Sequence, residues 1–517
     1  MRMLVLAAAV VVAGHPAFGH DWPQWGGLSP GRNVYSPAKG LPERFDPGKF
    51  KRGTDEVDLS TTRNIKWVAK LGSQSYGNPT VAGGRVFVGT NNDVPRDPRH
   101  QGDRSILLCL DEKTGELLWQ LVVPKLKAGS VNDWERLGIL SSPTVEGDRL
   151  CLVTSRAEVL CLDVAGMANG NDGPFKDEAQ YVVQDTDMPP VEPGPKDADI
   201  IWRYDMIDEL GVFPHNASDC SPLLFGGLLY VCTGNGQDWT HANVPFPFAP
   251  SLIALDAKTG RLAGEDDAQI GPRVFHGQWS SPSAGVVNGR ALVFFGAGDG
   301  VLYAFDAKPA AENGTNYLKK VWWFDCVPPE CKVKNGERIK YPAPEGPSEI
   351  VATPVFINNH VYIALGQDPE HGDGVGRLVC VDATQSGDVT KSAAVWSCKD
   401  IHRSLSTVGL DPESGLLFSA DFAGFVYCLE ADTGKLNWTH DMKANVWGST
   451  LVADGKVYTV DEDGDLAILA ARREKKLLSE ANLGAPAHST PVVANGVIYA
   501  ATASHLYAIH NAELQAK

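Results

Sequence analysis

The chain has 517 residues, of which 43% are hydrophobic, 21% charged and 9% aromatic. This balance excludes a disordered tail or a fibrous repeat and permits a large buried core. With 46 basic and 63 acidic residues the net charge is −17, which disfavours any function that depends on neutralising nucleic-acid phosphates. The 53 glycines and 34 prolines indicate short strands joined by turns.

The first residues follow the pattern of a secretory signal. Arg2 precedes an apolar run from Leu4 to Ala13, and Ala17-Phe18-Gly19 supplies the small residues that a signal peptidase reads. The run is shorter than the roughly 20 residues needed to cross a bilayer. We therefore expect residues 1–19 to be a cleaved signal peptide and the mature chain to be periplasmic or secreted. We expect no membrane span and no lipid attachment, because no cysteine lies near the cleavage site.

The ten cysteines do not have the spacing of a dense disulfide framework. One strand position of the repeat described below carries either cysteine or alanine, which predicts small buried thiols there. The exception is the pair Cys326 and Cys331, which flank Val-Pro-Pro-Glu in an expected surface loop. A short disulfide could form there after export. The four strand thiols are Cys109, Cys161, Cys380 and Cys428.

One sequence phrase recurs along nearly the whole chain. It consists of alternating apolar residues, an acidic residue, Lys-Thr-Gly or a relative, and then a tryptophan, with clear copies that begin at Leu107, Leu252 and Val426. A second phrase precedes each copy: Ser/Thr-Pro, an apolar strand, a glycine turn and another strand. Each unit therefore reads as four short strands with turns between them, which is the blade of a β-propeller.

Eight such units can be counted, and the ends of the chain predict how they close. The eighth unit stops without its tryptophan strand, whereas a lone strand of that kind, residues 64–71 with Trp67, precedes the first unit. We expect this strand to complete the last blade and to hide two exposed sheet edges; an open solenoid is the alternative. The predicted class is an all-β, eight-bladed β-propeller of four-stranded antiparallel blades. Its expected organisation is a signal peptide (1–19), an N-terminal extension (20–60), the propeller (61–511) and a C-terminal tail (512–517).

The repeated acid, glycine and tryptophan are interpreted as architecture. An aspartate can accept hydrogen bonds from turn amides and a glycine can adopt a positive φ, so together they shape the turn between the third and fourth strands. The tryptophan supplies a large apolar surface between neighbouring blades. Since the same chemistry recurs in most blades, ligand binding is not its expected role.

The phrase Leu-Tyr/Cys-Ala/Cys-Leu-Asp-Ala-Lys-Thr-Gly-Lys-Leu-x-Trp resembles the tryptophan-docking repeat of the pyrroloquinoline-quinone (PQQ) type of eight-bladed propeller. The resemblance covers residues 61–511. That superfamily includes quinoprotein alcohol and glucose dehydrogenases. It also includes non-enzymatic propellers, such as the lipoprotein of the outer-membrane β-barrel assembly machine. The resemblance implies the fold and leaves the function between these classes.

The quinoprotein resemblance implies a set of cofactor residues. Those enzymes hold PQQ over a tryptophan and beneath a disulfide between adjacent cysteines, with calcium bound by Glu and Asn and with an aspartate as general base. By this resemblance Asn235, within Thr233–Trp239, and Glu158 would bind calcium, and Trp279 or Trp447 would lie near the cofactor. The chain has no adjacent Cys-Cys pair, and serines stand where the aspartate is expected. A turn residue is the alternative role for Asn235.

A second set of candidates comes from the topology itself. In a propeller, the connections that enter the inner strands all emerge on one face, around the central channel. Their polar and aromatic residues could form a metal or ligand site, since loops on a rigid scaffold commonly carry function, or they could be solvated loop tips. These residues are His215, Asn216, Asp219, His276, Trp279, Glu349, His402, Arg403, Trp447 and His488.

These observations lead to two hypotheses about function. The first is an exported, non-enzymatic binding or scaffold module of the cell envelope that binds a protein partner on a rim formed by the insertions at 91–103 and 234–250. A small-molecule ligand in the channel is compatible with it, and nucleic acid is not expected. The alternative is a PQQ- and calcium-dependent quinoprotein oxidoreductase with a divergent site. The missing cysteine pair and general base favour the first hypothesis.

Overall fold

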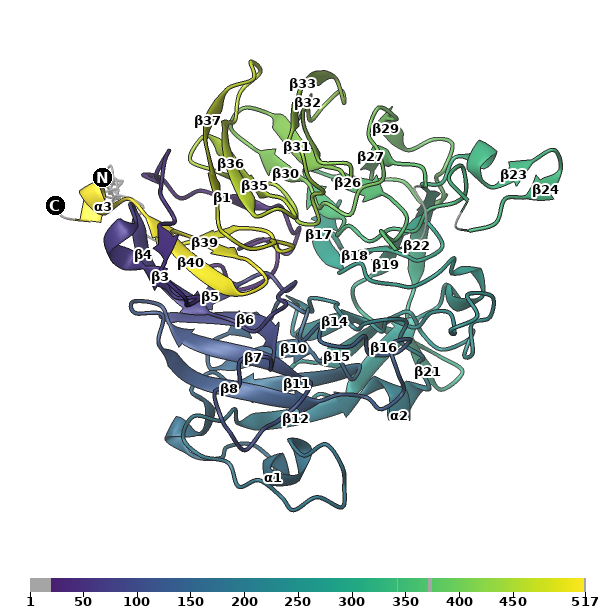
Figure 1. The fold of residues 1–517 in the computed structure, drawn as a ribbon. Coiled ribbons are helices and arrows are strands. Elements are labelled where there is room, and N and C mark those ends of the chain that lie inside the picture. The colour runs from purple at the N-terminus through teal and green to yellow at the C-terminus, as the bar shows by residue number, and fades with distance from the viewer. Residues whose placement is uncertain (1–19, 342, 371–373, 516–517) are drawn as a thin grey trace, which may run out of the picture.

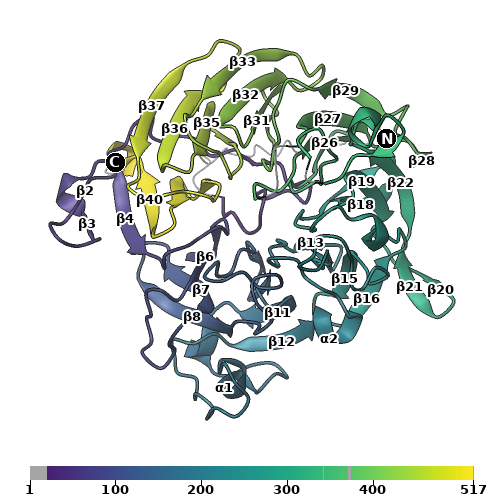
Figure 2. The ribbon, with the colours of Figure 1, turned by 45° about the vertical axis from the view of Figure 1, so that its right-hand side comes forward.

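A computed structural model describes residues 20–341, 343–370 and 374–515. The signal peptide expected at residues 1–19 lies outside the described residues. The described residues form a ring of eight antiparallel sheets around a central channel, and each sheet has four strands that follow one another from the channel to the rim (Figures 1 and 2). The predicted all-β, eight-bladed propeller is confirmed.

The strands of each blade are given from the channel outwards. Blade one contains β5 (Thr80–Ala82), β6 (Arg85–Asn91), β7 (Arg104–Asp111) and β8 (Leu117–Pro124). Blade two contains β9 (Thr144–Glu146), β10 (Arg149–Val153), β11 (Glu158–Asp163) and β12 (Ile200–Asp205). Blade three contains β13 (Leu223–Phe225), β14 (Leu228–Cys232), β15 (Leu252–Asp256) and β16 (Leu262–Asp266). Blade four contains β17 (Ser283–Val287), β18 (Arg290–Gly296), β19 (Val301–Asp306) and β22 (Lys320–Asp325).

The second half of the ring repeats this order. Blade five contains β25 (Val355–Ile357), β26 (His360–Leu365), β27 (Arg377–Asp382) and β29 (Ala394–Cys398). Blade six contains β30 (Gly409–Asp411), β31 (Leu416–Ala420), β32 (Phe425–Glu430) and β33 (Leu436–Asp441). Blade seven contains β34 (Leu451–Ala453), β35 (Lys456–Val460), β36 (Asp465–Ala470) and β37 (Leu477–Asn482). Blade eight contains β38 (Val492–Ala494), β39 (Val497–Ala501), β40 (His505–His510) and the N-terminal β4 (Ile65–Lys70).

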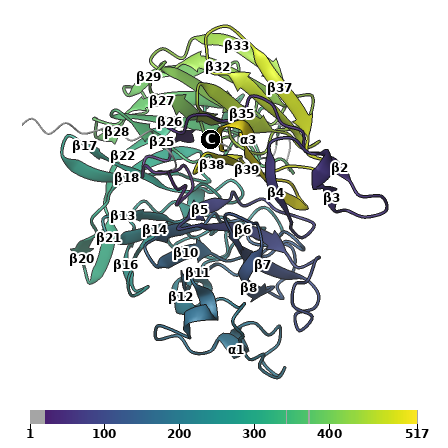
Figure 3. The same cartoon turned by 90° about the vertical axis from the view of Figure 1, so that its left-hand side faces the viewer.

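Short elements decorate the ring. Strands β20 and β21 (Ala310–Glu312, Thr315–Leu318) extend blade three, and β28 (Gly387–Asp388) extends blade four. The β2–β3 hairpin (Lys49–Phe50, Val57–Asp58) projects beside β4 (Figure 3). A second hairpin, β23–β24 (Val333–Lys334, Glu337–Arg338), follows blade four. The helices are α1 (Glu178–Tyr181), α2 (Met206–Leu210) and α3 (Ala512–Gln515), and none in the described part of the chain is long and apolar enough to span a membrane.

The ring closes as predicted. Strand β4 pairs antiparallel with β40, with Trp67 opposite Ala508 and Lys70 opposite His505, so the purple N-terminal strand lies beside the yellow C-terminal one (Figure 2). Closure between the two ends of the sequence removes the free edge that blade eight would otherwise expose.

The repeated tryptophans join neighbouring blades. The indole of Trp67 donates a hydrogen bond to the carbonyl of Glu112 at 3.0 Å, and the indole of Trp396 donates to the carbonyl of Ala431 at 2.7 Å. Each ring lies on the glycine that ends the Lys-Thr-Gly phrase of the next blade, which at Gly434 has a φ of +68°. The packing role expected for this motif is therefore the observed one.

The N-terminal segment has a role that the sequence pattern does not reveal. Residues 20–36 run along the channel, and their oxygen atoms accept hydrogen bonds from amides of the innermost strands, whose inner edges would otherwise lack partners. The segment ends at β1 (Tyr35–Ser36), which pairs in parallel with β34 of blade seven. The bonds run from Val81 to Trp22, from Val145 to Pro23, from Ala284 to Pro30, from Phe356 to Gly31, from Leu410 to the carboxamide oxygen of Asn33 and from Val452 to Val34.

Arg32 fixes this segment to blade three. Its fully buried guanidinium donates to the carbonyls of Ser221 and Pro222 at 3.2 and 2.7 Å, and also to the carbonyl of Trp25. Burial lowers the pKa of Arg32 to about 9. Residues 20–36 thus form a plug that is hydrogen-bonded to several blades and fills part of the channel.

All ten cysteines are free thiols. The four strand thiols are buried, as predicted from their exchange with alanine. The expected disulfide between Cys326 and Cys331 is not formed. Cys326 is buried directly after β22 with its sulfur 3.8 Å from the carbonyl of Phe324, whereas Cys331 ends a short 3₁₀ turn, Pro329–Cys331.

Candidate functional site

A hydrogen-bonded ring surrounds the channel where the innermost strands begin. The residue that opens each strand donates its backbone N–H to the side-chain oxygen of the equivalent residue in the next blade; for example, Ser142 donates to Ser221 at 3.0 Å. Between blades four and five the indole of Trp25 supplies the donor to Thr353, at 2.9 Å. This explains the Ser/Thr of the repeated Ser/Thr-Pro phrase. The other bonds join Asn78 to Ser142, Ser221 to Ser281, Thr353 to Thr407, Thr407 to Ser449, Ser449 to Thr490 and Thr490 to Asn78.

A cavity of about 340 Å³ lies at this ring, and residues from the connections before all eight innermost strands line it. Trp25 of the plug contributes to its wall. The large side chains of the wall are mainly aromatic, its charged side chains are acidic, and its described residues include neither lysine nor arginine. The aromatic residues are Trp25, Tyr76, Trp134, Trp279 and Trp447, and the acidic ones are Asp219, Asp368 and Glu370.

Burial controls the charge of two carboxyl groups at the cavity. It raises the pKa of Asp219 well above its ordinary value. It also raises the pKa of Glu349 to about 8, with the negative charge of Asp368 as the second cause. Glu349 accepts hydrogen bonds from the Tyr341 hydroxyl and from the Asp368 backbone N–H, both at 2.9 Å. Glu349 therefore supports the loop that carries Asp368 into the wall.

One side of the cavity is a stacked aromatic group. Tyr76 stacks on His488 with ring centroids 4.5 Å apart, and Trp447 meets His488 edge to face at 5.5 Å. The indole of Trp447 donates to Glu462 at 3.2 Å, which fixes the ring against the channel. Of the residues expected at the channel, Trp279, Trp447, His488, Asn216 and Asp219 line the cavity.

His402 and Arg403 were also expected at the channel, but they lie outside the cavity wall. His402 is 62% exposed at its side chain and its Nδ1 bonds to Asp421 at 2.8 Å. Arg403 packs its guanidinium over the ring of Phe422 at 4.5 Å and donates to the carbonyls of Asp368 and Pro369. It therefore braces the loop that forms the cavity wall, and neither residue is among those that line the cavity.

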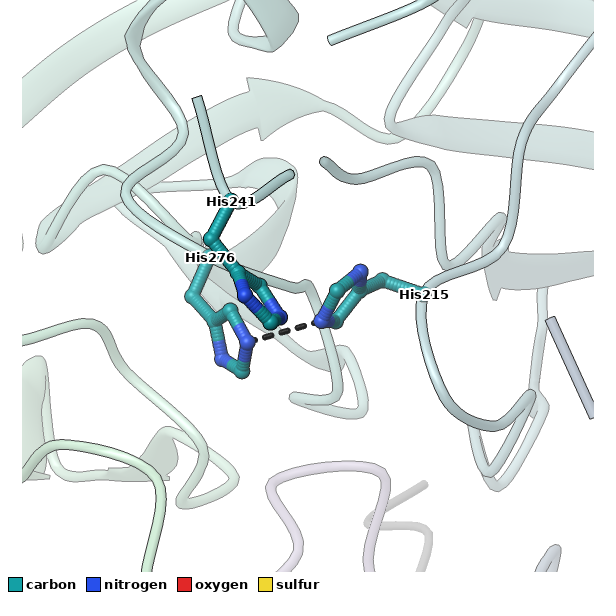
Figure 4. A group of neighbouring side chains, drawn as sticks. All are labelled: His215, His241 and His276. Atoms are coloured by element: carbon teal, nitrogen blue, oxygen red, sulfur yellow. Dashed lines mark hydrogen bonds between the residues drawn. The ribbon is translucent and has the colours of Figure 1, made fainter. Parts of the chain in front are cut away.

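His215 and His276, two further residues expected at the channel, meet behind Trp279. Their Nε2 atoms are 2.7 Å apart, and the indole of Trp279 donates to the carbonyl of His215 at 3.2 Å. A third imidazole, His241, joins them from the insertion at 234–250 (Figure 4). Sequence reasoning missed His241 because it interpreted this insertion only as a rim. Burial, together with the neighbouring His276, lowers the pKa of His215 to about 3.

Asn235 and Glu158, the residues with a resemblance to calcium ligands, are engaged elsewhere. The carboxamide of Asn235 accepts from the Phe213 N–H at 2.9 Å and donates to the Phe246 carbonyl at 3.0 Å. Glu158 lies in β11, where it pairs with Arg203 at 2.9 Å and accepts from the Tyr181 hydroxyl at 2.8 Å.

These contacts do not fit a PQQ–calcium centre. Calcium requires six to eight oxygen ligands. The carboxamide of Asn235 is engaged by backbone groups, and Glu158 belongs to no cluster of three or more His, Cys, Asp or Glu ligand groups in the described part of the chain. The acidic cavity wall also disfavours a quinone that itself carries carboxylates.

A family model described as "Outer membrane protein assembly factor BamB" matches residues 57–166 and 376–513. No curated protein sequence gives a significant match.

Solved structures share the fold at low sequence identity. The crystal structure of BamB from Moraxella catarrhalis is 15% identical with a TM-score of 0.54, covering 86% of this chain and 99% of that one. A europium-containing methanol dehydrogenase is 11% identical with a TM-score of 0.54, covering 94% and 90%. A quinohemoprotein alcohol dehydrogenase from Pseudomonas putida HK5 is 12% identical with a TM-score of 0.55, covering 94% and 80%. The chain is thus an eight-bladed β-propeller whose repeats, in the matched segments, are similar to those of the PQQ-like family model.

Proposed function

We propose that this chain is an exported, non-enzymatic binding propeller whose channel cavity receives a basic, partly apolar segment of a protein partner. The observation that carries this proposal is the composition of the cavity wall. Asp368 and Glu370 supply negative charge, and Asp219 supplies a carboxyl group that a bound cation would favour in its ionised form. Aromatic rings supply apolar and cation-attracting faces, and the described lining residues include no cationic Lys or Arg side chain. Carboxylates and aromatic faces together are the groups that bind lysine and arginine side chains.

The rim beside the cavity supports a protein partner over a small ion. The insertion at 234–250 exposes large apolar side chains: Trp239 is 73% exposed and Phe248 is 79% exposed. Trp134 lines the cavity and is 43% exposed, so it extends the apolar surface from the channel to the rim. Grouped exposed aromatic residues mark interaction surfaces.

The cellular setting is inferred from the N-terminus and from the matched family. The pattern of residues 1–19 predicts export, and the family whose model matches is described as an outer-membrane assembly factor. We therefore place the partner in the cell envelope. No specific contact of Asn235 or Glu158 favours the quinoprotein alternative.

The proposal is tested by selecting random 12-residue peptides on the purified mature protein and measuring their affinity through the fluorescence of the channel tryptophans. We expect the selected peptides to carry Arg or Lys next to apolar residues. The double variant Asp219→Asn, Glu370→Gln should weaken their binding at least about tenfold, because each lost ion pair in a partly buried site costs about 1 kcal/mol or more. Affinity should rise with pH, since a bound cation requires Asp219 to release its proton.

A matched double variant, Glu312→Gln, Glu345→Gln, removes the same charge from exposed surface positions outside the cavity and should bind the peptides as the parent protein does. Selection of neutral or acidic peptides, or equal losses in both double variants, would refute a basic ligand in the channel.

A further inference from the structure

Three loops bring imidazole rings to one point next to the channel. His215 precedes β13, His276 precedes β17, and His241 lies in the long connection between β14 and β15. Because strands alternate in direction within a blade, both kinds of connection emerge on the same face of the ring. The three rings point toward one another in Figure 4. The cluster thus joins blades three and four at the face where the cavity lies.

The distances between the rings are those of a ligand set. One nitrogen from each histidine lies within 4.8 Å of the others. The ring centroids are 4.2 Å apart for His215 and His276, 5.2 Å for His215 and His241, and 5.0 Å for His241 and His276. Tetrahedral Zn²⁺ with bonds of about 2.0–2.1 Å places its nitrogen ligands about 3.3 Å apart. Small side-chain rotations would bring all three nitrogens to that separation.

Groups outside the cluster lie against two of the histidines, and one of them fixes the tautomer of His215. Nδ1 of His215 lies 2.7 Å from the carbonyl oxygen of Gln237, and Nδ1 of His276 lies 3.3 Å from a carboxylate oxygen of Asp368. The Gln237 carbonyl can only accept, so Nδ1 of His215 carries the hydrogen and its Nε2 offers a lone pair to the centre. The Asp368 carboxylate lies beside Nδ1 of His276 as a charged neighbour. Backbone carbonyls and carboxylates in this position are the usual outer partners of metal-binding histidines, which they orient and make more basic.

Because Nε2 of His215 offers a lone pair, its 2.7 Å contact with Nε2 of His276 requires either a hydrogen on His276 Nε2 or a metal ion between the two nitrogens. A hydrogen on Nε2 of His276 accounts for the contact of these two rings, but it gives no reason for a third imidazole in the same place. A metal ion accounts for all three. Histidine nitrogens favour first-row transition metals over Mg²⁺ or Ca²⁺, which prefer oxygen.

We propose that His215, His241 and His276 bind a divalent first-row transition metal ion, with Zn²⁺ as the probe that tests it. Three protein ligands leave a coordination position for water or a ligand, the arrangement of reactive rather than purely structural zinc sites. Asp368 both contacts His276 and lines the cavity, so the metal centre would adjoin the cavity wall. This inference is independent of the proposed peptide ligand.

The experiment uses the mature protein after treatment with a chelator and titrates it with ZnCl₂ alone, in competition with a chromophoric zinc indicator. We expect one equivalent of zinc to bind with submicromolar affinity. His215→Ala and His276→Ala should each weaken binding at least about 100-fold. Asp368→Asn should weaken it about 10- to 100-fold, as expected when the outer partner of a ligand is removed.

Cobalt(II) provides a second readout, because its visible absorption reports coordination directly. The Co²⁺ complex of the parent protein should show nitrogen-ligated, low-symmetry bands that His241→Ala reduces even if that variant keeps its fold. His360→Gln, which replaces a half-buried histidine in β26 outside the cluster, is the matched control and should bind zinc as the parent does.

Thermal unfolding of each variant separates loss of a ligand from loss of the fold. Absence of stoichiometric zinc binding in the folded parent, or binding that survives both His215→Ala and His276→Ala, would overturn the proposal. If the folded parent binds no zinc, the 2.7 Å contact between His215 and His276 is explained by a hydrogen bond between the two rings.

Discussion

At the scale of single residues, Glu349 shows how the channel wall depends on protonation. Its carboxyl group is fully buried, has a pKa of about 8 and receives hydrogen bonds from Tyr341 and from the Asp368 backbone. The unfolded chain releases this proton near pH 4.5. Between these values the folded state binds more protons than the unfolded state, so this group lowers stability as the pH rises from about 4.5 to 8.

Glu349→Gln should remove that loss. The amide oxygen can accept the same two hydrogen bonds, and the amide never ionises, so it imitates the protonated acid. We expect the variant to lose less stability than the parent between pH 5 and pH 8.5 and to exceed it by at least about 1 kcal/mol at the upper pH. Urea unfolding at both pH values measures this. Parallel pH profiles for the two proteins would show that Glu349 is ionised in the fold.

At the scale of the structural element, a glycine in the turn before the tryptophan strand joins neighbouring blades in the three blades with the clearest repeat. Gly434 has a φ of +68°, and a Cβ added there would lie 2.5 Å from the ring of Trp396. Gly115 and Gly260 meet Trp67 and Trp202 in the same way. The repeated Thr-Gly therefore serves two purposes, a left-handed turn and close contact with a neighbouring indole.

Comparing Gly434→Ala with Gly455→Ala separates the cost of the left-handed backbone from the cost of the contact with the indole. Gly455 has a similar φ of +66° but nothing within 4 Å of the added Cβ, so its substitution costs only the backbone strain, about 1 kcal/mol. Gly434→Ala should cost at least about 1–3 kcal/mol more, because it also displaces the indole. Thermal unfolding of the two variants gives the difference. Equal losses would mean that the indole moves without cost.

At the scale of the whole molecule, the N-terminal region holds the ring together in two places. Strand β4 completes blade eight, and the plug at 20–36 supplies acceptors to innermost strands of blades one, two, four, five, six and seven. Both contacts join segments that are far apart in the sequence. Closure in this protein therefore depends on the chain ahead of the first full blade.

Deleting residues 20–71 should remove both contacts and abolish cooperative unfolding or lower the stability by several kcal/mol, because it uncovers the edge of β40 and leaves inner-strand amides without partners. Deleting 20–36 alone should have a smaller effect, since β4 remains. Circular dichroism during heating distinguishes the two deletions. An unchanged melting temperature for the longer deletion would contradict the closure observed between β4 and β40.

The local chemistry of the sequence determined the fold. Blades share one set of turn, packing and hydrogen-bonding requirements, so the Ser/Thr-Pro and Asp-x-Lys-Thr-Gly phrases recur wherever a blade is built, and the unpaired strand around Trp67 indicated how the ring closes. The positions of some channel residues could also be predicted, because the topology sends every inner connection to one face. Trp279, Trp447 and His488 line the cavity there, and His215 and His276 lie behind Trp279.

Only the tertiary structure decided which of those residues meet. His241 joins His215 and His276 because its loop folds back over the face of the ring, and no periodicity in the sequence reports the path of a long insertion. Arg32 and Trp25 likewise reach the channel only in the folded chain, since most bonds between the plug and the innermost strands are made by its backbone carbonyls and leave no pattern in the sequence. The repeat could be recognised because its side chains form turns and contacts with nearby residues, so they follow a fixed spacing in the sequence. The site depends on distances between residues of different blades, and these distances exist only after the ring has closed.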